Sequence, residues 1–499
     1  MGTYRWARTS KGADSVPDSP TVAIVGGGCS GTLAAIQLLA QPGRGHDRPQ
    51  VVMVERTADV ALGAAYRTSC ERHLLNVRAG EMSAYPHDPG HFVRWLRRDD
   101  DGIDEGSFVP RRLYGRYLRT ILEEAQTPSG TVHVVRGHVV GVVPRVGRRL
   151  TLRCAAGSSF DADAVILAVG HFPPRRLPVA SPAVEMSGRY IGDPWAGGAL
   201  SAIPSGATVV LVGSGLTAVD AALTLSSNGH RGPILALSRH GLLPQAHRLS
   251  PTPAPERPPD GGSECALPAP AVLSGRVTSA RDLLVAIRRQ AAGAGAEPGG
   301  DWRSVIDGLR PESNQIWAAL PLAEQQRVLR HLRSFWSIHR HRMAPQAAQW
   351  IAELQASGQL RVDAGRVVRC SVRPDGLRVE VRGRGSDAAT AGDIGYLVNC
   401  TGPETDVTRL GDPLLTALLT RGLARLGALG MGLAVGTDGA VLDRAGQASG
   451  RLWAIGSLRQ GTEWETTAVP ELRRQAASVA AQLRAHVQTA DLGPYQEAV

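Results

Sequence analysis

The stretch VAIVGGGCSG, residues 22–31, decides the fold of this chain. Its glycines Gly26, Gly28 and Gly31 supply the pattern G-x-G-x-x-G between an apolar run and a segment with helical spacing. In a βαβ unit these glycines make the tight turn, let the backbone approach a pyrophosphate, and let the helix pack closely on the strand. The phosphates then meet the helix N-terminus, where Ser30 lies. The stretch therefore predicts a dinucleotide site.

The next apolar run, residues 50–55, ends in Glu55, which stands 24 positions after Gly31. A carboxylate at the end of the second strand can accept hydrogen bonds from both ribose hydroxyls of a dinucleotide. Strand, turn, helix and acid are thus in register, which favours a ligand site over a glycine turn with no ligand. We add the following residue, Arg56, to the candidate cofactor contacts.

A second unit of the same kind begins at VVLVGSGLTAVD, residues 209–220, with Gly213 and Gly215 in its turn. The strand that follows ends in LALSRHG, so Ser238 and Arg239 stand where the first unit has an acid. A carboxylate there would repel a 2′-phosphate, whereas these two side chains can donate hydrogen bonds to it. The second site should therefore prefer NADP(H), unless Arg239 is an ordinary surface arginine.

The composition narrows the class of protein. A chain of 499 residues with 43% hydrophobic and 20% charged residues is long enough for at least two domains. Its net charge of +10 suits nucleotide phosphates, but no nucleic-acid-binding motif is present. The six cysteines include no C-x-x-C pair, which argues against a zinc site and a redox disulfide. With no apolar run long enough for a membrane, we expect a cytoplasmic protein without bound metal.

These observations predict an α/β fold with two Rossmann-like dinucleotide-binding domains, one for FAD and one for NADPH, and a mostly helical insertion. The expected divisions are a disordered lead-in at 1–20, an FAD-binding domain at 21–175 and 396–490, an NADPH-binding domain at 176–250 and 357–395, and a Pro-rich loop with a helical insertion at 251–356.

Two sites of opposite preference resemble the arrangement of the two-dinucleotide-binding flavoproteins. The stretch AVILAVGHFPP, with Gly170, resembles the linker between their two domains, and LVNCTGPETD, with Thr401 and Gly402, resembles its second copy. RLWAIGS resembles the late strand that approaches the ribityl chain of the flavin. That strand usually ends Gly-Asp, whereas here it ends with Gly456 and Ser457. The resemblance implies cofactor contacts at Gly170, Thr401, Gly402 and Gly456.

The nearest likeness is to the bacterial FAD/NAD(P)-binding protein family, related to the flavin-dependent N-hydroxylating monooxygenases. It is carried by both Rossmann units and by HLLNVRAGEMSAYPHDPGHFVRWL, FVPRRLYGRYL, SFWSIHRHRMAP and QGTEWETTAVPELRRQA, from about residue 21 to 485. In the last stretch the resemblance implies that Thr467 and Ala468 bring a helix N-terminus to the flavin, where its partial positive charge stabilises the reduced form.

The resemblance implies an NADPH- and O2-dependent FAD monooxygenase that N-hydroxylates a small amine or amino acid through a C4a-(hydro)peroxyflavin. An NADPH-dependent flavin oxidoreductase without substrate oxygenation is the alternative, and a nucleotide-binding protein without turnover is a third. No histidine is present in EMSGRYIGDPWAGGALS, where Baeyer–Villiger enzymes carry one, so that chemistry is disfavoured. The partners are then a small-molecule substrate and O2, with a homodimer left open.

The candidate catalytic residues are Asn76, Arg340 and His341. The family places a polar amide over the flavin ring, and Asn76 in HLLNV is the candidate here, unless it only ends a helix or strand. Arg340 and His341 belong to the cluster HRHR at 339–342, which could bind a substrate carboxylate, bind cofactor phosphates, or form a solvated helix end. Helical spacing puts Trp336 and Arg340 on one face.

Overall fold

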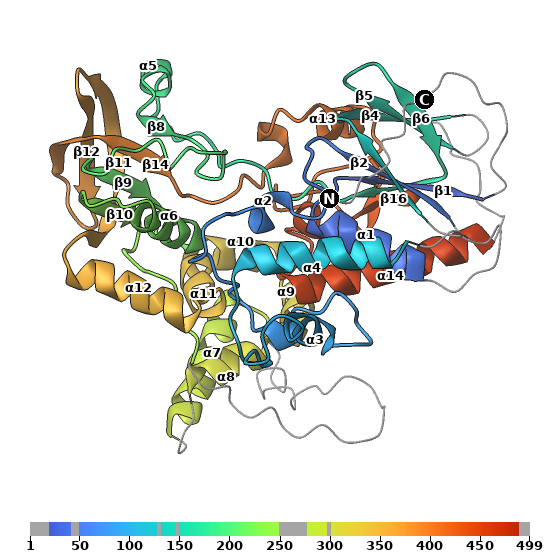
Figure 1. Ribbon diagram of the computed structural model, residues 1–499, viewed down its shortest axis with the longest axis horizontal. Helices are drawn as coiled ribbons and strands as arrows, with labels where there is room; N and C mark the ends of the chain where they lie inside the picture. Colours follow the sequence, from blue (N-terminus) through green and yellow to red (C-terminus); the bar gives the residue numbers. More distant parts are fainter. Residues whose placement is uncertain are drawn as a thin grey trace.

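The computed structural model describes residues 19–40, 49–126, 131–145, 149–248, 277–296 and 301–488 (Figure 1). The lead-in expected at 1–20, apart from its last two residues, and the Pro-rich run at 250–265 lie outside these residues. The fold class is the expected one, because two sheets built mainly of parallel strands form separate lobes, with helices on their faces.

The first sheet has six strands in the order β15-β16-β7-β1-β2-β3. All neighbouring pairs in it are parallel except β15 with β16. Strand β1, in the middle of the sheet, is buried along its whole length, as expected of an apolar strand covered on both faces. The strands are β1 Thr21–Val25, β2 Gln50–Glu55, β3 Val132–Arg136, β7 Ala164–Leu167, β15 Ala440–Leu442 and β16 Ala448–Ala454.

Three helices that lie side by side cover one face of this sheet, and a small sheet with one helix packs on the other face (Figure 1). Trp453, Tyr114 and Phe92 are fully buried between the sheet and the helices. On the first face lie α1 Cys29–Ala40, α4 Arg111–Glu124 and α14 Val469–Gln488; on the other lie β4 Val139–Pro144, β5 Leu150–Cys154, β6 Ser159–Ala162 and α13 Pro413–Thr420.

The second sheet has seven strands in the order β13-β12-β11-β10-β9-β14-β8. Its strands are β8 Tyr190–Ile191, β9 Val209–Val212, β10 Ile234–Ser238, β11 Leu360–Arg373, β12 Gly376–Gly383, β13 Ala389–Ile394 and β14 Tyr396–Asn399. Buried side chains join α6 Leu216–Ser227 and α12 Pro345–Ala356 to one face, and α5 Pro182–Met186 to the other.

One expected boundary differs from the structure. The sequence assigned residues from 396 onward to the first lobe, but β14 pairs in parallel with β9, so the second sheet extends to Asn399. The apolar run YLVN forms β14. It pairs in parallel with β9 on the side away from β10, as β7 pairs with β1 in the first sheet. The two chain crossings between the lobes then run side by side, with Pro174 bridged to Pro403.

The expected insertion is helical over residues 280–296 and, with short breaks, over 302–356, and its helices α7 and α8 lie in the lower part of Figure 1. Its helices are α7 Ala280–Ala296, α8 Trp302–Gly308, α9 Ser313–Ala319, α10 Leu322–Arg327, α11 Arg333–Arg340 and α12, with a π-helical turn η4 Val328–Leu332. The remaining short elements are α2 Gly63–Tyr66, α3 His91–Leu96 and the 3-10 turns η2 Ala79–Glu81, η3 Arg310–Glu312, η5 Val407–Arg409 and η6 Gly456–Arg459.

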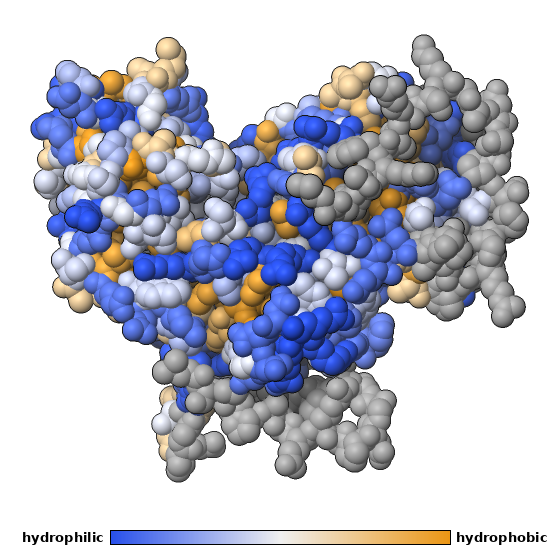
Figure 2. Space-filling model, viewed as in Figure 1, coloured by the Kyte–Doolittle hydropathy of each residue, from blue (hydrophilic) through white to orange (hydrophobic). Residues whose placement is uncertain are grey.

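A buried ion pair ties the two lobes together. Arg111 of α4 holds Asp220 of α6 through two hydrogen bonds of 2.7 and 3.2 Å, and both side chains are largely buried. Figure 2 shows a mostly hydrophilic face that is hollowed between the two lobes. No helix in the described part of the chain combines the length and apolarity needed to cross a membrane.

Candidate functional site

The first glycine turn forms a cradle at the carboxyl end of β1. Gly26 has a φ of +104°, and a Cβ atom on it would lie 2.3 Å from the carbonyl oxygen of Ala168. A Cβ on Gly31 would lie 1.9 Å from the carbonyl oxygen of Gly26, so helix and turn touch directly. Gly28 differs, because a Cβ there meets only Gly63, at 3.3 Å, and otherwise faces open space. Two glycines thus permit packing, and Gly28 keeps a cleft open.

Glu55 is held firmly at the side of this cleft. One carboxylate oxygen accepts a hydrogen bond from the Gly27 amide at 2.7 Å, and the other accepts from the amide and hydroxyl of Thr57 at 2.8 and 2.9 Å. The side chain is 8% exposed and lines the cleft. A carboxylate has about four acceptor positions, so this orientation leaves capacity for a ribose hydroxyl. Arg56 and Ser30 line the same cleft.

The far wall of the cleft is formed by the ends of β7 and β16. Gly170, with a φ of +72°, Gly456 and Ser457 all line it. The Ser457 hydroxyl donates to the carbonyl of Gly170, so this serine joins the two strand ends.

The N-terminus of α14 lies at the edge of the same cleft. Thr467 lines the cleft, and the amide of Leu472 donates to the carbonyl of Ala468 at 2.9 Å, which makes residue 468 the cap of α14. Gln475 of this helix accepts a hydrogen bond from the Gly456 amide at 2.9 Å. The N-terminus of α14 is therefore fixed to the strand end that closes the cleft.

The glycine cradle, the oriented acid and the helix N-terminus fit FAD. Gly28 leaves room where the pyrophosphate would lie, Glu55 can meet the adenosine ribose, and α14 would present its positive end to the flavin.

The second turn repeats the geometry of the first. Gly213 has a φ of +117°, and a Cβ on it would lie 2.3 Å from the carbonyl oxygen of Cys400. The carbonyl of Cys400 therefore packs against Gly213 in the same way as the carbonyl of Ala168 packs against Gly26. Thr401 and Gly402 follow directly after Cys400, so they lie beside the second turn. Their contact with a cofactor stays a prediction.

Gly215 caps α6 with extended backbone, and a Cβ on it would meet nothing within 4 Å. The hydroxyl of Ser238 lies 2.7 Å from that of Ser214 and accepts from the Gly241 amide at 3.1 Å. Ser238 thus shapes the loop after β10. Its hydroxyl is already engaged, which leaves the arginines of this region as the stronger partners for a phosphate.

Arg239 stands beside a second arginine that the sequence reading missed. Its guanidinium lies 3.5 Å from the hydroxyl of Ser334, at the start of α11, and Arg333 precedes that serine. Arg239 and Arg333 are both exposed. Within the described part of the chain, no ion pair joins either arginine to a carboxylate. Two neighbouring unpaired cations suit a 2′-phosphate.

Asn76 lies where the lobes and the helical region meet. Its carbonyl accepts a hydrogen bond from His247 Nε2 at 3.1 Å. Burial and the neighbouring Arg342 lower the pKa of His247 to about 3, so this ring is neutral and carries its proton on Nε2. Asn76 is not among the residues that line the first cleft. A role for its amide at the flavin stays a prediction.

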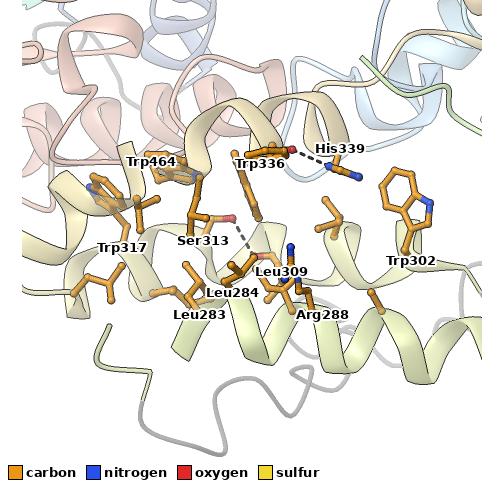
Figure 3. A pocket seen from close by; sticks show the side chains of 18 residues that line it. Leu283, Leu284, Arg288, Trp302, Leu309, Ser313, Trp317, Trp336, His339 and Trp464 are labelled. Carbon is orange, nitrogen blue, oxygen red and sulfur yellow. Dashed lines mark hydrogen bonds between the residues drawn. The ribbon is translucent and has the colours of Figure 1, made fainter. Parts of the chain in front are cut away.

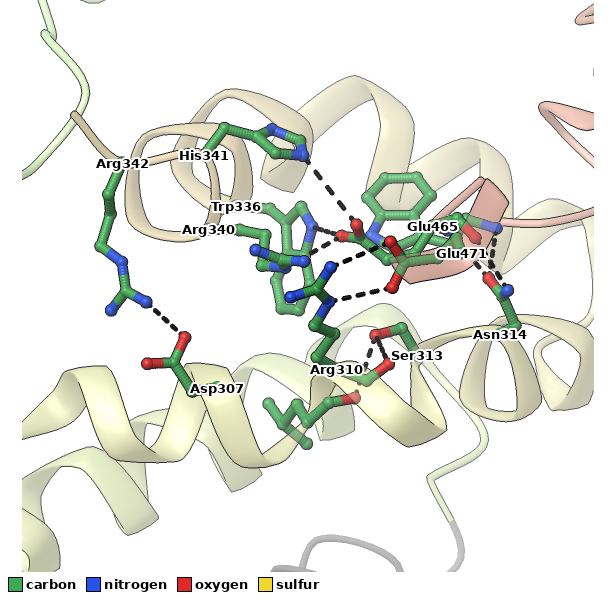
Figure 4. Close-up of polar contacts among 12 residues, drawn as sticks. Asp307, Arg310, Ser313, Asn314, Trp336, Arg340, His341, Arg342, Glu465 and Glu471 are labelled. Carbon is green, nitrogen blue, oxygen red and sulfur yellow. Dashed lines mark hydrogen bonds and ion pairs between the residues drawn. The ribbon is translucent and has the colours of Figure 1, made fainter. Parts of the chain in front are cut away.

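Two members of the cluster at 339–342 are buried, and Arg340, His341 and Arg342 each lie near a carboxylate (Figure 4). Arg340 is 7% exposed, and its Nε lies 3.4 Å from Glu465 Oε1. His341 is exposed, with Nε2 4.0 Å from the other oxygen of Glu465, and the buried Arg342 pairs with Asp307. The solvated alternative is therefore wrong for the two arginines, whose buried guanidiniums are paired with protein carboxylates. Trp336 and Arg340 share a face, as helical spacing predicted.

Two further contacts hold the segment before α14. Asn314 of α9 accepts from the backbone amides of Trp464 and Glu465, both at 2.8 Å, and donates to the Glu465 carbonyl at 2.9 Å (Figure 4). Arg310 holds Glu471, in the first turn of α14, through bonds of 2.9 and 3.0 Å. No spacing rule connects residues this far apart in the sequence, so only the structure could reveal this clamp.

Cys70 is the most acidic thiol among the described cysteines. Burial opposes its ionisation, but hydrogen bonds to His73 and Ser227 outweigh this effect and lower its pKa to about 7. Burial instead raises the pKa of Cys29 to about 12 and also raises that of Cys400. Since the thiolate is the nucleophile, Cys70 should be selectively reactive.

Iodoacetamide is therefore expected to alkylate Cys70 first, with a rate that rises with pH around a midpoint near 7. His73→Gln should move this midpoint upward, because the thiolate loses a hydrogen-bond partner. Peptide mass mapping at several pH values measures both rates. A wild-type midpoint near the ordinary thiol value of 9.0 would contradict the assignment.

The comparisons with known proteins agree with this geometry. Residues 23–172 match a family model described as FAD-NAD(P)-binding. An uncharacterized protein of Mycobacterium tuberculosis is 25% identical over 440 residues, covering 81% of this chain and 78% of its own.

Two solved structures share the fold at low identity. L-lysine 6-monooxygenase from Pseudomonas syringae is 16% identical with a TM-score of 0.62, and ornithine N-hydroxylase from Kutzneria sp. 744 is 14% identical with a TM-score of 0.60. Each comparison covers 94% of this chain and 99% of the other. Residues 23–172 therefore match an FAD-NAD(P)-binding family model, and the chain shares its fold with these two monooxygenases.

Proposed function

We propose that this protein is an NADPH- and O2-dependent FAD monooxygenase that hydroxylates the nitrogen of an amine. The observation that carries the proposal is the pair of equivalent glycine turns with opposite charge beside them. Gly26 meets Ala168 and Gly213 meets Cys400 at the same 2.3 Å, with Glu55 beside one turn and Arg239 after the other. One chain thus supports an adenosine ribose at the first turn and a 2′-phosphate at the second.

The named solved structures extend this proposal to the reaction. Their names describe an N-hydroxylase of ornithine and a 6-monooxygenase of L-lysine. The chemistry that FAD supplies when bound is to take a hydride from NADPH and pass electrons to O2. The described residues around the first cleft hold its walls in place. Gln475 fixes the start of α14 to Gly456, and Ser457 joins Gly456 to the end of β7 at Gly170.

The cysteines disfavour a disulfide acceptor. A flavoprotein that reduces disulfides needs two thiols beside the flavin, and Cys29 is the one described cysteine that lines the first cleft. Burial raises the pKa of its thiol to about 12, so it is a poor nucleophile. This favours O2 over a thiol-based acceptor.

We propose positioning roles for Arg340 and His341. Both contact Glu465, and this glutamate belongs to the segment that leads into Thr467 at the first cleft. The side chain of His341 is 46% exposed, and the buried Arg340 makes the closer contact with Glu465. The domains proposed are an FAD-binding unit of 21–175 with 400–490 and an NADPH-binding unit of 176–250 with 357–399.

Stoichiometry tests the proposal. Purified holoenzyme is mixed with NADPH and a panel of amines, while NADPH loss, O2 uptake, peroxide and product mass are followed. A monooxygenase should yield one hydroxylated product for each NADPH with some amine, and turnover should rise with pH toward the amine's pKa, because an ammonium has no free electron pair. Stoichiometric peroxide with every amine would favour the plain flavin oxidoreductase instead.

A further inference from the structure

The helical region holds a partly open apolar cavity of about 340 Å³ (Figure 3). It lies between α7, α8, α9 and α11 and is bordered by the segment before α14. Four of the chain's nine tryptophans line it, although aromatic residues are only 4% of the sequence. These four are Trp302, Trp317, Trp336 and Trp464, and Trp317 and Trp464 lie with their ring centroids 4.4 Å apart.

The polar groups of the lining are few. The Ser313 hydroxyl lies 2.9 Å from the carbonyl of Leu309, so it is already paired within the helix. His339 uses Nδ1 on the carbonyl of Phe335 at 2.8 Å and packs edge-on against Trp302. Arg288 is exposed at the rim, and none of the 18 lining residues is an acid. The cavity can therefore bind an apolar group, but its lining has no carboxylate that could pair with an ammonium group.

Such a volume is unusual for simple packing. Protein cores are close-packed, with few voids larger than a water molecule. A ligand pocket, by contrast, holds roughly 300–1,000 Å³ and is lined mainly by apolar and aromatic side chains. The cavity of about 340 Å³ falls in that range, and an apolar cavity binds apolar molecules more readily than water.

The cavity adjoins the first dinucleotide cleft through one short segment. Trp464 lines the cavity, while Thr467, three residues later, lines the cleft. Asn314 holds the backbone of this segment at Trp464 and Glu465. The segment 464–467 therefore separates the cavity from the cleft.

We propose that the cavity holds the apolar body of the amine, an alkyl or aromatic group, with the nitrogen directed past Trp464 toward the cleft. This inference rests on the proposed function and narrows its substrate from small amines and amino acids to apolar monoamines. The lack of an acid in the lining disfavours diamines, and the rim cation Arg288 adds repulsion against a second ammonium group.

Isothermal titration calorimetry of the holoenzyme without NADPH tests the cavity separately from turnover. The probes are n-butylamine, n-hexylamine and n-octylamine, compared with cadaverine. Burial of one methylene is worth about 0.8 kcal/mol, so binding should tighten about fourfold for each added methylene until the cavity is full. The heat-capacity change should be negative and grow along the series. Cadaverine should bind more weakly than n-butylamine.

A matched pair of variants locates the site. Ala291 lines the cavity, whereas its neighbour Ala292 is exposed and does not. Ala291→Trp should fill the cavity and weaken n-hexylamine binding by at least about tenfold, a loss of about two methylenes of contact. Ala292→Trp should leave the binding constant unchanged. Thermal melts show whether both variants fold.

The outcomes separate the two proposals. If affinity in the wild-type protein does not depend on chain length, or if Ala291→Trp binds as well as Ala292→Trp, the cavity is not the amine site, even where turnover is seen. If chain-length dependence is found but no amine is oxygenated, the cavity assignment stands and the monooxygenase proposal fails.

Discussion

Gly28→Val is expected to give folded but colourless protein. The side chain would enter the space where the pyrophosphate lies, because a Cβ on Gly28 meets only Gly63, at 3.3 Å. The variant should retain less than about a tenth of the FAD bound by the wild type, since a displaced pyrophosphate loses the helix N-terminus. The visible spectrum and chromatography of the cofactor released on denaturation measure this loss, and the wild type should release FAD and no FMN.

Two other glycines, one exposed and one tightly packed, provide contrasting controls. Gly206→Val introduces the same side chain at an exposed position with nothing within 4 Å, and it should remain fully yellow. Gly31→Val should fail to fold, because its Cβ would lie 1.9 Å from the Gly26 carbonyl. Circular dichroism distinguishes these cases. Full FAD content in Gly28→Val would mean that the first turn does not hold the cofactor.

The double substitution Arg239→Ala with Arg333→Ala is expected to abolish the preference for NADPH over NADH. A hydrogen bond to a charged group is worth roughly 1.5–3 kcal/mol, so losing two should reduce the ratio of kcat/KM values by about a hundredfold or more. The reason is that both cations stand near the end of β10 without a carboxylate partner in the described structure. Rates of flavin reduction with each coenzyme measure the ratio.

Arg369→Ala is the matched control for this experiment. Arg369 lies on β11 of the same sheet, is 76% exposed and is 3.9 Å from Glu380, so its loss should leave coenzyme choice unchanged. The single variants assign the effect. If Arg239→Ala and Arg333→Ala both keep the wild-type ratio, the 2′-phosphate binds elsewhere.

The periodic parts of the fold could be predicted because their causes are local. The strand at 50–55 and the helix at 216–227 follow from apolar periodicity and from the glycine turns beside them. Glu55 could be placed because register on a strand fixes the side to which its last residue points. These features depend on residues close together in the sequence.

The rest depends on contacts between distant segments. Nothing near Arg333 in the sequence indicates that α11 begins beside Arg239, and nothing near Asn314 indicates that it holds Trp464. The same limit explains the error at β14, whose place in the second sheet is set by pairing with β9. A charge cluster such as 339–342 gives no sign of the distant acid that neutralises it until Glu465 is placed beside it.

The short segment from Trp464 to Thr467 forms a wall of both the apolar cavity and the dinucleotide cleft. A ligand that shifts this segment acts on both sites, and each ligand then changes the affinity for the other by the same factor. An amine that binds the reduced protein more tightly than the oxidised one must therefore raise the midpoint potential of the flavin by the equivalent free energy. Amines that differ in this binding preference would therefore set different midpoint potentials of the flavin.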